Sequence, residues 1–157
     1  MNILRAKVAI IGDQRVGKTC LVSQLVKQYF NNTYQTTLGI DYNTHEVKIK
    51  DSNYSVQLHI LDCTGFSAFT DIVTSQLSDA NFIIYVYDAT NLESFQGIKL
   101  WKETVKESVQ NKNCVELLVG NKTDLEKKIT VDETSVKNLS SLYNFKAFSV
   151  SAVRIFK

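Results

Sequence analysis

Short apolar runs rich in β-branched and aromatic residues recur along the chain. They occupy residues 6–11, 82–87 and 115–119, and each is too short for a helix of ordinary length. Continuous apolar runs of this kind are typical of parallel strands that are buried on both faces of a sheet. The pattern therefore predicts a core of parallel strands.

The longer segments between these runs have the spacing of amphipathic helices. Apolar residues recur there at helical intervals, as in the two sets Leu21, Leu25 and Val26, and Leu100, Trp101 and Val105. Strands that alternate with helices predict a doubly wound α/β fold. We expect one such domain over residues 1–157, because neither a linker nor an internal repeat interrupts the pattern.

Two segments depart from the continuous apolar pattern. Residues 42–50 and 54–62 alternate polar with apolar positions, and the turn-forming trio Asp51, Ser52 and Asn53 joins them. Alternation on both sides of a turn predicts an antiparallel hairpin. The sheet is therefore expected to be mixed, with one antiparallel edge strand.

Composition narrows the possible partners and compartments. The chain of 157 residues has 18 Lys and Arg against 16 Asp and Glu, so it lacks the basic excess of nucleic-acid binders and no nucleic-acid partner is expected. Its three cysteines are odd in number and widely spaced, which favours reduced thiols and a cytoplasmic location. No signal peptide, membrane span or terminal prenylation box is recognisable, so we expect no direct membrane anchor.

A phosphate-binding loop pattern follows directly on the first predicted strand. Its residues are Gly12, Asp13, Gln14, Arg15, Val16, Gly17, Lys18 and Thr19. The backbone N–H groups of such a loop and the following helix N-terminus surround a polyphosphate. Lys18 can place its charge at the outer phosphates, and the Thr19 hydroxyl can coordinate Mg²⁺. A chance match is the alternative, but the preceding strand and following helix favour the functional interpretation.

The segment from Asp62 to Gly65, at the end of the predicted hairpin, carries a second motif. Asp62 can hold Mg²⁺ through water, and the Gly65 N–H can reach a γ-phosphate. An aspartate followed by a glycine at a strand end is by itself more typical of a turn. The functional interpretation depends on the phosphate-binding loop.

Asn121, Lys122, Thr123 and Asp124 form a third motif after a buried strand. A carboxylate at Asp124 can accept hydrogen bonds from the N1–H and the exocyclic amine of guanine, whereas adenine would leave it unpaired. Lys122 can lay its aliphatic stem along the base, and Asn121 can brace the phosphate-binding loop. Alone, the motif could be a polar turn. Cys20 and Leu125, which adjoin two of the motifs, complete the candidate nucleotide-binding residues from these segments.

The order and spacing of the three motifs resemble the Ras superfamily of small GTPases over nearly the whole chain. The similarity is greatest to the Rab and Rab-like branch, in the switch I pattern at residues 37–42 and in the stretch 87–95. The resemblance implies a P-loop small-GTPase domain with a mostly parallel six-stranded sheet. It also implies GTP or GDP as ligand and Mg²⁺ as cofactor.

The resemblance assigns roles to further residues. Thr37 is the switch threonine that ligates Mg²⁺ with GTP bound, and Phe30 is the aromatic residue that stacks on guanine. Ser151 and Ala152 form the last guanine motif, in which the Ala152 N–H meets the base oxygen. Val153 stands there in place of the usual lysine.

The resemblance also gives the reaction, metal and partner assignments. Lys18, Thr37 and Gly65 act in the reaction, and Thr19, Thr37 and Asp62 hold the metal. An effector or complex subunit is expected at the switch regions, residues 37–42 and 65–72.

Several positions depart from the family pattern. Phe66 follows Gly65, where the family has the glutamine that orients the attacking water. Gln14 and Arg15 replace small residues and can crowd the γ-phosphate. Slow hydrolysis is expected from both changes. Leu61 replaces a tryptophan of the Rab effector surface, although Tyr42 keeps an aromatic ring, and this argues against the usual Rab effectors.

In lacking the lipidation cysteine and in replacing the glutamine, the chain also resembles the Rab-like GTPases of intraflagellar transport, which are subunits of a ciliary transport complex. This resemblance implies a role in intracellular or ciliary transport and a location that includes the cilium or flagellum. The family continues into a final helix after the last motif, and this sequence stops at Lys157. We expect that helix to be absent from the chain or replaced by a partner.

Two functions remain open at this stage. One is a switch that cycles between GTP and GDP, which the intact Thr37, Asp62 and Gly65 favour. The other is a nucleotide-stabilised, hydrolysis-deficient interaction subunit, which Phe66 favours. An adenine-specific P-loop enzyme is disfavoured by Asp124.

Four residues outside the motifs receive structural interpretations. Trp101 is expected in the core and Gly97 at an ordinary helix or loop position. His45 and His59 are expected to be surface or packing residues, because no second metal ligand lies at a useful spacing from either.

Overall fold

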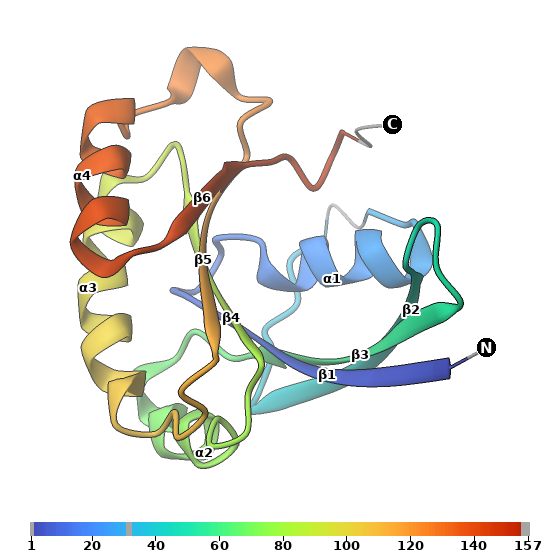
Figure 1. Ribbon diagram of the computed structural model, residues 1–157. Helices are drawn as coiled ribbons and strands as arrows, with labels where there is room; N and C mark the ends of the chain where they lie inside the picture. The colour runs from blue at the N-terminus through green and yellow to red at the C-terminus, as the bar shows by residue number, and fades with distance from the viewer. Residues whose placement is uncertain (1, 31–32, 155–157) are drawn as a thin grey trace.

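The computed structural model describes residues 2–30 and 33–154, and within these ranges six strands form one sheet in the order β2-β3-β1-β4-β5-β6 (Figure 1). The strands are β1 Asn2–Ile11, β2 Ile40–Lys48, β3 Tyr54–Cys63, β4 Phe82–Asp88, β5 Val115–Asn121 and β6 Lys146–Ser149. β2 pairs antiparallel with β3, and every other pairing is parallel. The predicted mixed sheet with one antiparallel edge strand is confirmed.

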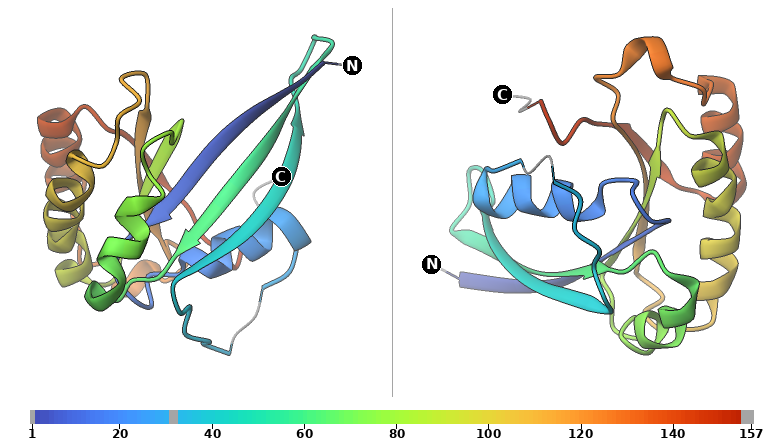
Figure 2. Two further views of the ribbon diagram at one scale, coloured as in Figure 1. Left: turned by 90° about the horizontal axis from the view of Figure 1, so that it is seen from below. Right: turned by 180° about the vertical axis from the view of Figure 1, so that it is seen from behind.

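β1 begins four residues earlier than the apolar run at residues 6–11 predicts. Its additional residues pair with the start of β3, from Asn2 opposite Tyr54 onwards. Ile3 and Leu4 are about half exposed, so backbone pairing rather than burial holds this part of the strand. Figure 2 shows the resulting arm of β1, β2 and β3 projecting past the helices.

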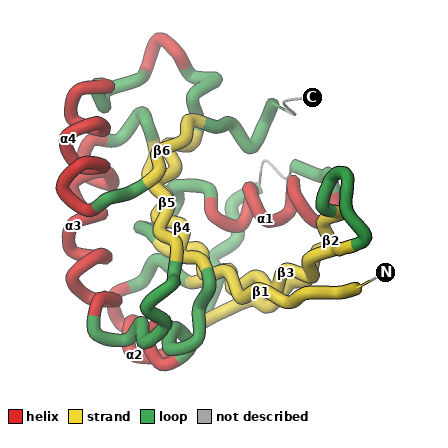
Figure 3. Tube along the Cα trace, viewed as in Figure 1, coloured by secondary structure: helices red, strands yellow, loops and turns green. Residues whose placement is uncertain are grey.

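α-Helices flank the sheet, as the secondary-structure colouring of Figure 3 shows. They are α1 Lys18–Lys27, α2 Thr70–Ser75, α3 Leu92–Lys106 and α4 Glu133–Tyr143, with 3-10 turns at Ser67–Phe69 and Glu126–Lys128. Side chains cap the N-termini of α3 and α4. Asn91 accepts a hydrogen bond from the Ser94 N–H of α3, and Asp132 accepts one from the Ser135 N–H of α4. The predicted helices around Leu25 and Trp101 are α1 and α3.

The two faces of the sheet are covered unequally. α1 lies on one face, and α2, α3 and α4 lie on the other (Figure 2). β1 supplies both cores, because Ala9 and Ile11 point to the α2–α4 side while Val8 and Ile10 point to α1. No helix follows β6 up to residue 154, the last described residue, and Phe148, opposite Val119 of the α1-side core, stays half exposed.

None of the helices within residues 2–30 and 33–154 is long and apolar enough to span a lipid bilayer.

Candidate nucleotide-binding site

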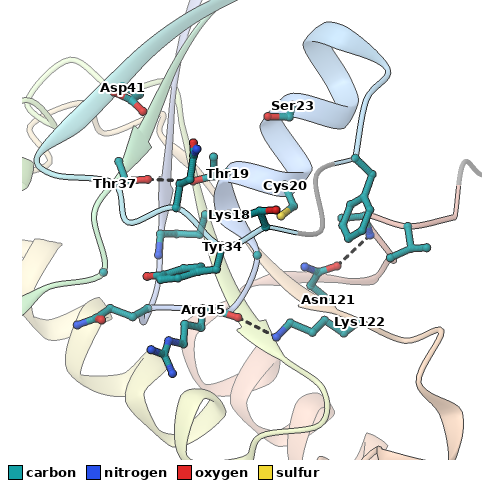
Figure 4. A pocket seen from close by; sticks show the side chains of 18 of the residues that line it. Arg15, Lys18, Thr19, Cys20, Ser23, Tyr34, Thr37, Asp41, Asn121 and Lys122 are labelled. Atoms are coloured by element: carbon teal, nitrogen blue, oxygen red, sulfur yellow. Dashed lines mark hydrogen bonds between the residues drawn. The ribbon is translucent and has the colours of Figure 1, made fainter.

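A cavity of about 810 Å³ opens beside the phosphate-binding loop and the carboxyl end of β5 (Figure 4). This edge is where doubly wound α/β proteins bind ligands, and the volume lies in the range of small-molecule sites. Fourteen of the predicted site residues line it: Gln14, Arg15, Gly17, Lys18, Thr19, Cys20, Phe30, Thr37, Gly65, Asn121, Lys122, Asp124, Leu125 and Ala152. Gly12, Asp13, Val16, Asp62 and Ser151 do not line it, but each contacts a residue that does, as described below.

The phosphate-binding loop is wedged between β4 and Asn121. Gly12 and Gly17 have φ angles of 148° and 97°, in the region that favours glycine. A Cβ atom would collide with the Val86 carbonyl at Gly12 and with the Asn121 side chain at Gly17. Both glycines of the motif are therefore required by the fold.

The ammonium group of Lys18 is buried at the end of this loop. Its Nζ donates to the backbone carbonyls of Gly12 at 2.8 Å and Asp13 at 2.7 Å. Burial lowers the pKa of Lys18 to about 8, although the nearby carboxylates of Asp62 and Asp13 act to raise it. Because its hydrogen bonds go to neutral carbonyl groups, and no carboxylate among the described residues forms an ion pair with it, the group is well suited to an anionic ligand.

The three predicted metal residues meet beside Lys18. The hydroxyl oxygens of Thr19 on α1 and Thr37 before β2 lie 3.0 Å apart (Figure 4), and Thr19 also hydrogen-bonds the Asp62 carboxyl group. Burial raises the pKa of Asp62, whereas Thr19 and Lys18 lower it.

These groups fit Mg²⁺. The Oδ1 atom of Asp62 is buried without a hydrogen-bond partner among the described residues, and a buried polar atom of this kind is costly unless a ligand satisfies it. Carboxylate and hydroxyl oxygens are the hard ligands that Mg²⁺ prefers. Bound there with a nucleotide, Mg²⁺ would neutralise phosphate charge.

Gly65 packs directly against the phosphate-binding loop. A Cβ atom at this position would collide with the Gln14 backbone nitrogen and come within 2.5 Å of the Asp13 backbone carbon. The next residue, Phe66, is half-buried and lines the cavity, with its ring centroid 6.5 Å from that of Phe69. The segment after β3 therefore places an aromatic side chain at the end of the cavity that is lined by Gln14, Lys18 and Gly65. We call this end the phosphate end.

Asn121 connects three segments at the other end of the cavity. Its Nδ2 donates to the Val16 carbonyl at 2.9 Å, which is the expected brace to the phosphate-binding loop. Its Oδ1 accepts from the Ala152 N–H at 3.2 Å (Figure 4). The role of that N–H toward a base oxygen stays a prediction.

The side chain of Lys122 is held at its charged end. Its Nζ lies 2.6 Å from Asp88 Oδ2 and donates to the Arg15 carbonyl at 2.8 Å. Burial acts to raise the pKa of Asp88, but hydrogen bonds from Lys122 and Thr90 outweigh it and leave that pKa lowered. Asp88 therefore holds Lys122 as a charged partner.

Asp124 has a partner within the protein. Its Oδ1 accepts from the Ser151 hydroxyl at 2.6 Å, and Ser151 Oγ also accepts from the backbone N–H groups of Val153 and Arg154. Ser151 thereby orients the carboxylate, although it does not line the cavity.

Several contributors were missed or only partly described from the sequence. Tyr34 lines the cavity, with its ring centroid 5.3 Å from the Arg15 guanidinium carbon. Asp88 is an acidic residue at a strand end, a signal that could have marked it. Trp101 is in the core and Gly97 in a helix, as predicted, but both also contact Asp13.

The two histidines stay outside the site. His45 is half-buried in β2 and His59 exposed in β3, and no group of three His, Cys, Asp or Glu within residues 2–30 and 33–154 is arranged to hold a metal ion.

The fold and this cavity define a P-loop nucleotide-binding protein. A family model described as Ras family matches residues 7–156. The chain is also 36% identical over 146 residues to the Ras-related protein Rab-13 of Bos taurus and to that of Rattus norvegicus, which covers 93% of this chain and 70% of each relative. The chain therefore belongs to the Ras family and is a Rab-like GTPase switch. Members of this family bind GTP or GDP with Mg²⁺.

Proposed function

We propose that this chain is a Rab-like switch that binds guanine nucleotide tightly and hydrolyses GTP slowly without a partner. The observation that carries the proposal is Phe66, which lines the phosphate end of the cavity directly after Gly65. By resemblance to the family, this is the position of the glutamine that orients the attacking water.

Phosphoryl transfer asks the protein to position the attacking water and to stabilise charge that spreads over the phosphate. Lys18 supports the second requirement with its own charge, and Thr19 and Asp62 would support it by holding Mg²⁺. A phenyl ring cannot meet the first requirement, because it has no group that hydrogen-bonds water. The expected deficit therefore lies in the chemical step, while binding stays tight.

Single-turnover hydrolysis of Mg²⁺-GTP by the purified protein, measured beside its affinities for GTP and GDP, tests the proposal. We expect a rate at or below the ~10⁻⁴ s⁻¹ scale of unassisted small GTPases that do have the glutamine. A rate well above that scale, with no partner added, would show that another residue positions the water.

The switch regions support a role in partner binding. Leu38 and Tyr42 before and in β2, and Ile72 in α2, are exposed large apolar residues, whereas Leu61 is only 1% exposed. The surface that an effector or complex subunit would meet is therefore built around Tyr42 without a contribution from Leu61. This favours a partner different from those of ordinary Rab proteins.

A second candidate function is the nucleotide-stabilised interaction subunit, favoured by the same Phe66. The two candidates differ in whether the partner distinguishes nucleotide states. A cycling switch binds its partner with different affinities when loaded with GDP or with a non-hydrolysable GTP analogue, and a nucleotide-stabilised subunit binds equally in both states.

From the resemblance alone we further propose that the protein acts in intracellular or ciliary transport. A fluorescent fusion expressed in ciliated cells tests this assignment. Enrichment along the axoneme supports the ciliary role, and uniform cytoplasmic signal in both cilium-bearing and non-ciliated cells contradicts it.

A further inference from the structure

The side chain of Asp13 turns away from the nucleotide cavity and contacts α3. Its Oδ1 accepts a hydrogen bond from the Trp101 indole N–H at 2.7 Å. Its Oδ2 lies against Gly97, where a Cβ atom would come within 2.8 Å of that oxygen. In Figure 1 the end of β1, which leads into the phosphate-binding loop, is directed toward α3.

The sequence of α3 makes room for this contact. Gly97 and Trp101 are four positions apart, so they share one face of the helix. The glycine leaves a gap next to the indole, and the carboxylate occupies it. Trp101 is only 7% exposed, and a buried indole N–H normally requires an acceptor. An ionised acceptor makes the stronger kind of hydrogen bond.

The backbone of the same residue contacts two functional groups. The Asp13 carbonyl accepts from Lys18 Nζ at 2.7 Å, and the peptide between Asp13 and Gln14 is the surface on which Gly65 packs. Asp13 thus joins α3, the buried lysine and Gly65, where the second switch region, residues 65–72, begins.

We propose that Asp13 and Trp101 form a positioning pair, with Gly97 as the space that admits it. The pair fixes the position of the Asp13–Gln14 peptide. That peptide in turn positions the ammonium group of Lys18 and sets how closely Gly65 packs against the loop. The Asp13 side chain and Trp101 do not line the cavity, so they act through these residues. The inference rests on the proposed nucleotide-binding function and extends it to α3.

Release of fluorescent GDP and GTP analogues from loaded protein tests the pair. We expect Trp101→Phe, which keeps an aromatic ring but loses the N–H, and Asp13→Ala to speed release about tenfold, a change within reach of one hydrogen bond to a charged group. The double variant should release no faster than either single one. Asp13→Asn retains an acceptor oxygen but loses the charge, so it should release nucleotide faster than wild type and more slowly than Asp13→Ala. Leu100→Ala, on the exposed side of the same helix, is the control.

A purely structural contact predicts a different outcome. In that case, loss of the contact would lower the thermal unfolding midpoint of the nucleotide-free protein. Asp13→Asn would not rescue nucleotide release, and the release rates of the single and double variants would not be non-additive. Release within twofold of wild type for Asp13→Ala, or additive effects in the double variant, overturns the inference. Nucleotide release from Asp13→Ala alone tests the inference even if Trp101→Phe fails to fold.

Trp101 is the only tryptophan of the chain, so its emission reports the contact directly. Asp13→Ala should shift that emission, and Asp13→Asn should shift it less; an unchanged spectrum in both overturns the contact. If the wild type bound no guanine nucleotide, the proposed function would fail and the inference with it. If the wild type binds nucleotide tightly and the variants release it at the wild-type rate, only the inference fails and the proposed function stands.

Discussion

The two ends of the cavity differ in how their polar groups are satisfied. At the end that carries the Asn121 motif, Asn121 bonds Val16 and Ala152, Lys122 bonds Asp88, and Asp124 bonds Ser151. At the phosphate end, among the described residues, Lys18 Nζ donates only to backbone carbonyl groups and Asp62 keeps an oxygen without a partner.

This difference separates two properties of the site. Groups that are held by other protein groups are already oriented, which favours selectivity because a ligand need not pay to order them. Groups whose charge or hydrogen bonds are incomplete gain most when a charged ligand arrives. We therefore expect base selectivity to reside at one end, and affinity and nucleotide-state sensing at the other.

Removing the Asp124 carboxylate should have the largest effect on selectivity. Wild-type protein is expected to prefer GTP and GDP over ATP by about 10⁴-fold, since a site built for a polar contact rejects a ligand that leaves it unpaired. Asp124→Ala should reduce that preference to roughly tenfold or less. Competition binding measures it, with Ser151→Ala as a milder companion that removes only the orienting hydroxyl. Equal displacement by ATP in wild type would sink the base assignment.

Lys18→Ala should have the largest effect on affinity. The ammonium is the buried cation of the phosphate end, and loss of one partner of a buried charge interaction corresponds to roughly 100-fold or more in affinity. Both GTP and GDP should be affected, without a change in base preference. Titration with a fluorescent GDP analogue measures the loss, and Lys99→Ala, an exposed lysine of α3, controls for net charge. Unaltered affinity would place the phosphates elsewhere.

Thr19→Asn should distinguish nucleotide states at the phosphate end. The Thr19 hydroxyl meets both Thr37 and Asp62, so its loss should disrupt the proposed metal site as a whole. A bound Mg²⁺ would neutralise phosphate charge, of which GTP carries more than GDP, so affinity for Mg²⁺-GTP should fall more than affinity for GDP, by about tenfold or more. Affinities measured with and without chelator test this. A GTP affinity indifferent to Mg²⁺ would refute the metal roles of all three residues.

Phe66→Gln should raise the single-turnover hydrolysis rate by roughly tenfold, because a side chain that can orient water replaces one that cannot. Gln14 lines the same cavity. If it fills the space needed, only the double change with Gln14→Gly should recover the rate. Affinity for GTP should change little in either variant, and Phe66→Leu is the control for altered packing. No gain in any variant would mean that water positioning is not what limits the reaction.

The sequence predicts those features whose signal lies in neighbouring residues. The phosphate-binding loop is an example, since its two glycines at positive φ and its lysine follow one another within one loop. The hairpin is another, because alternation and a turn trio mark it. The start of β1 was not predicted because Ile3 and Leu4 are exposed, so burial leaves no pattern there.

The connections between motifs were less predictable. Trp101 bonds Asp13 from a helix far along the chain, and Asp88 reaches Lys122 from a neighbouring strand. Each depends on the order in which the strands lie in the sheet, which no local pattern records. The apolar spacing of α3 predicts that Trp101 is buried, but it does not predict where the indole N–H points.

The smallest effect is expected at the mouth of the cavity, where the Arg15 guanidinium carbon lies 5.3 Å from the Tyr34 ring centroid. Both side chains are exposed, and an exposed cation–π contact contributes about 0.5–1 kcal/mol. If this contact helps to hold the segment before Thr37 over the ligand, Arg15→Ala should speed nucleotide release by roughly two- to fivefold. Tyr34→Phe keeps the ring and should release as wild type does, whereas Tyr34→Ala should match Arg15→Ala. Arg5→Ala, an exposed arginine outside the cavity, controls for the lost charge.

Because the Arg15 carbonyl also accepts from Lys122, the base preference should be measured in the same variants. A change in that preference would mean that the two ends of the cavity are coupled through Arg15, and that the separation of selectivity from affinity does not hold.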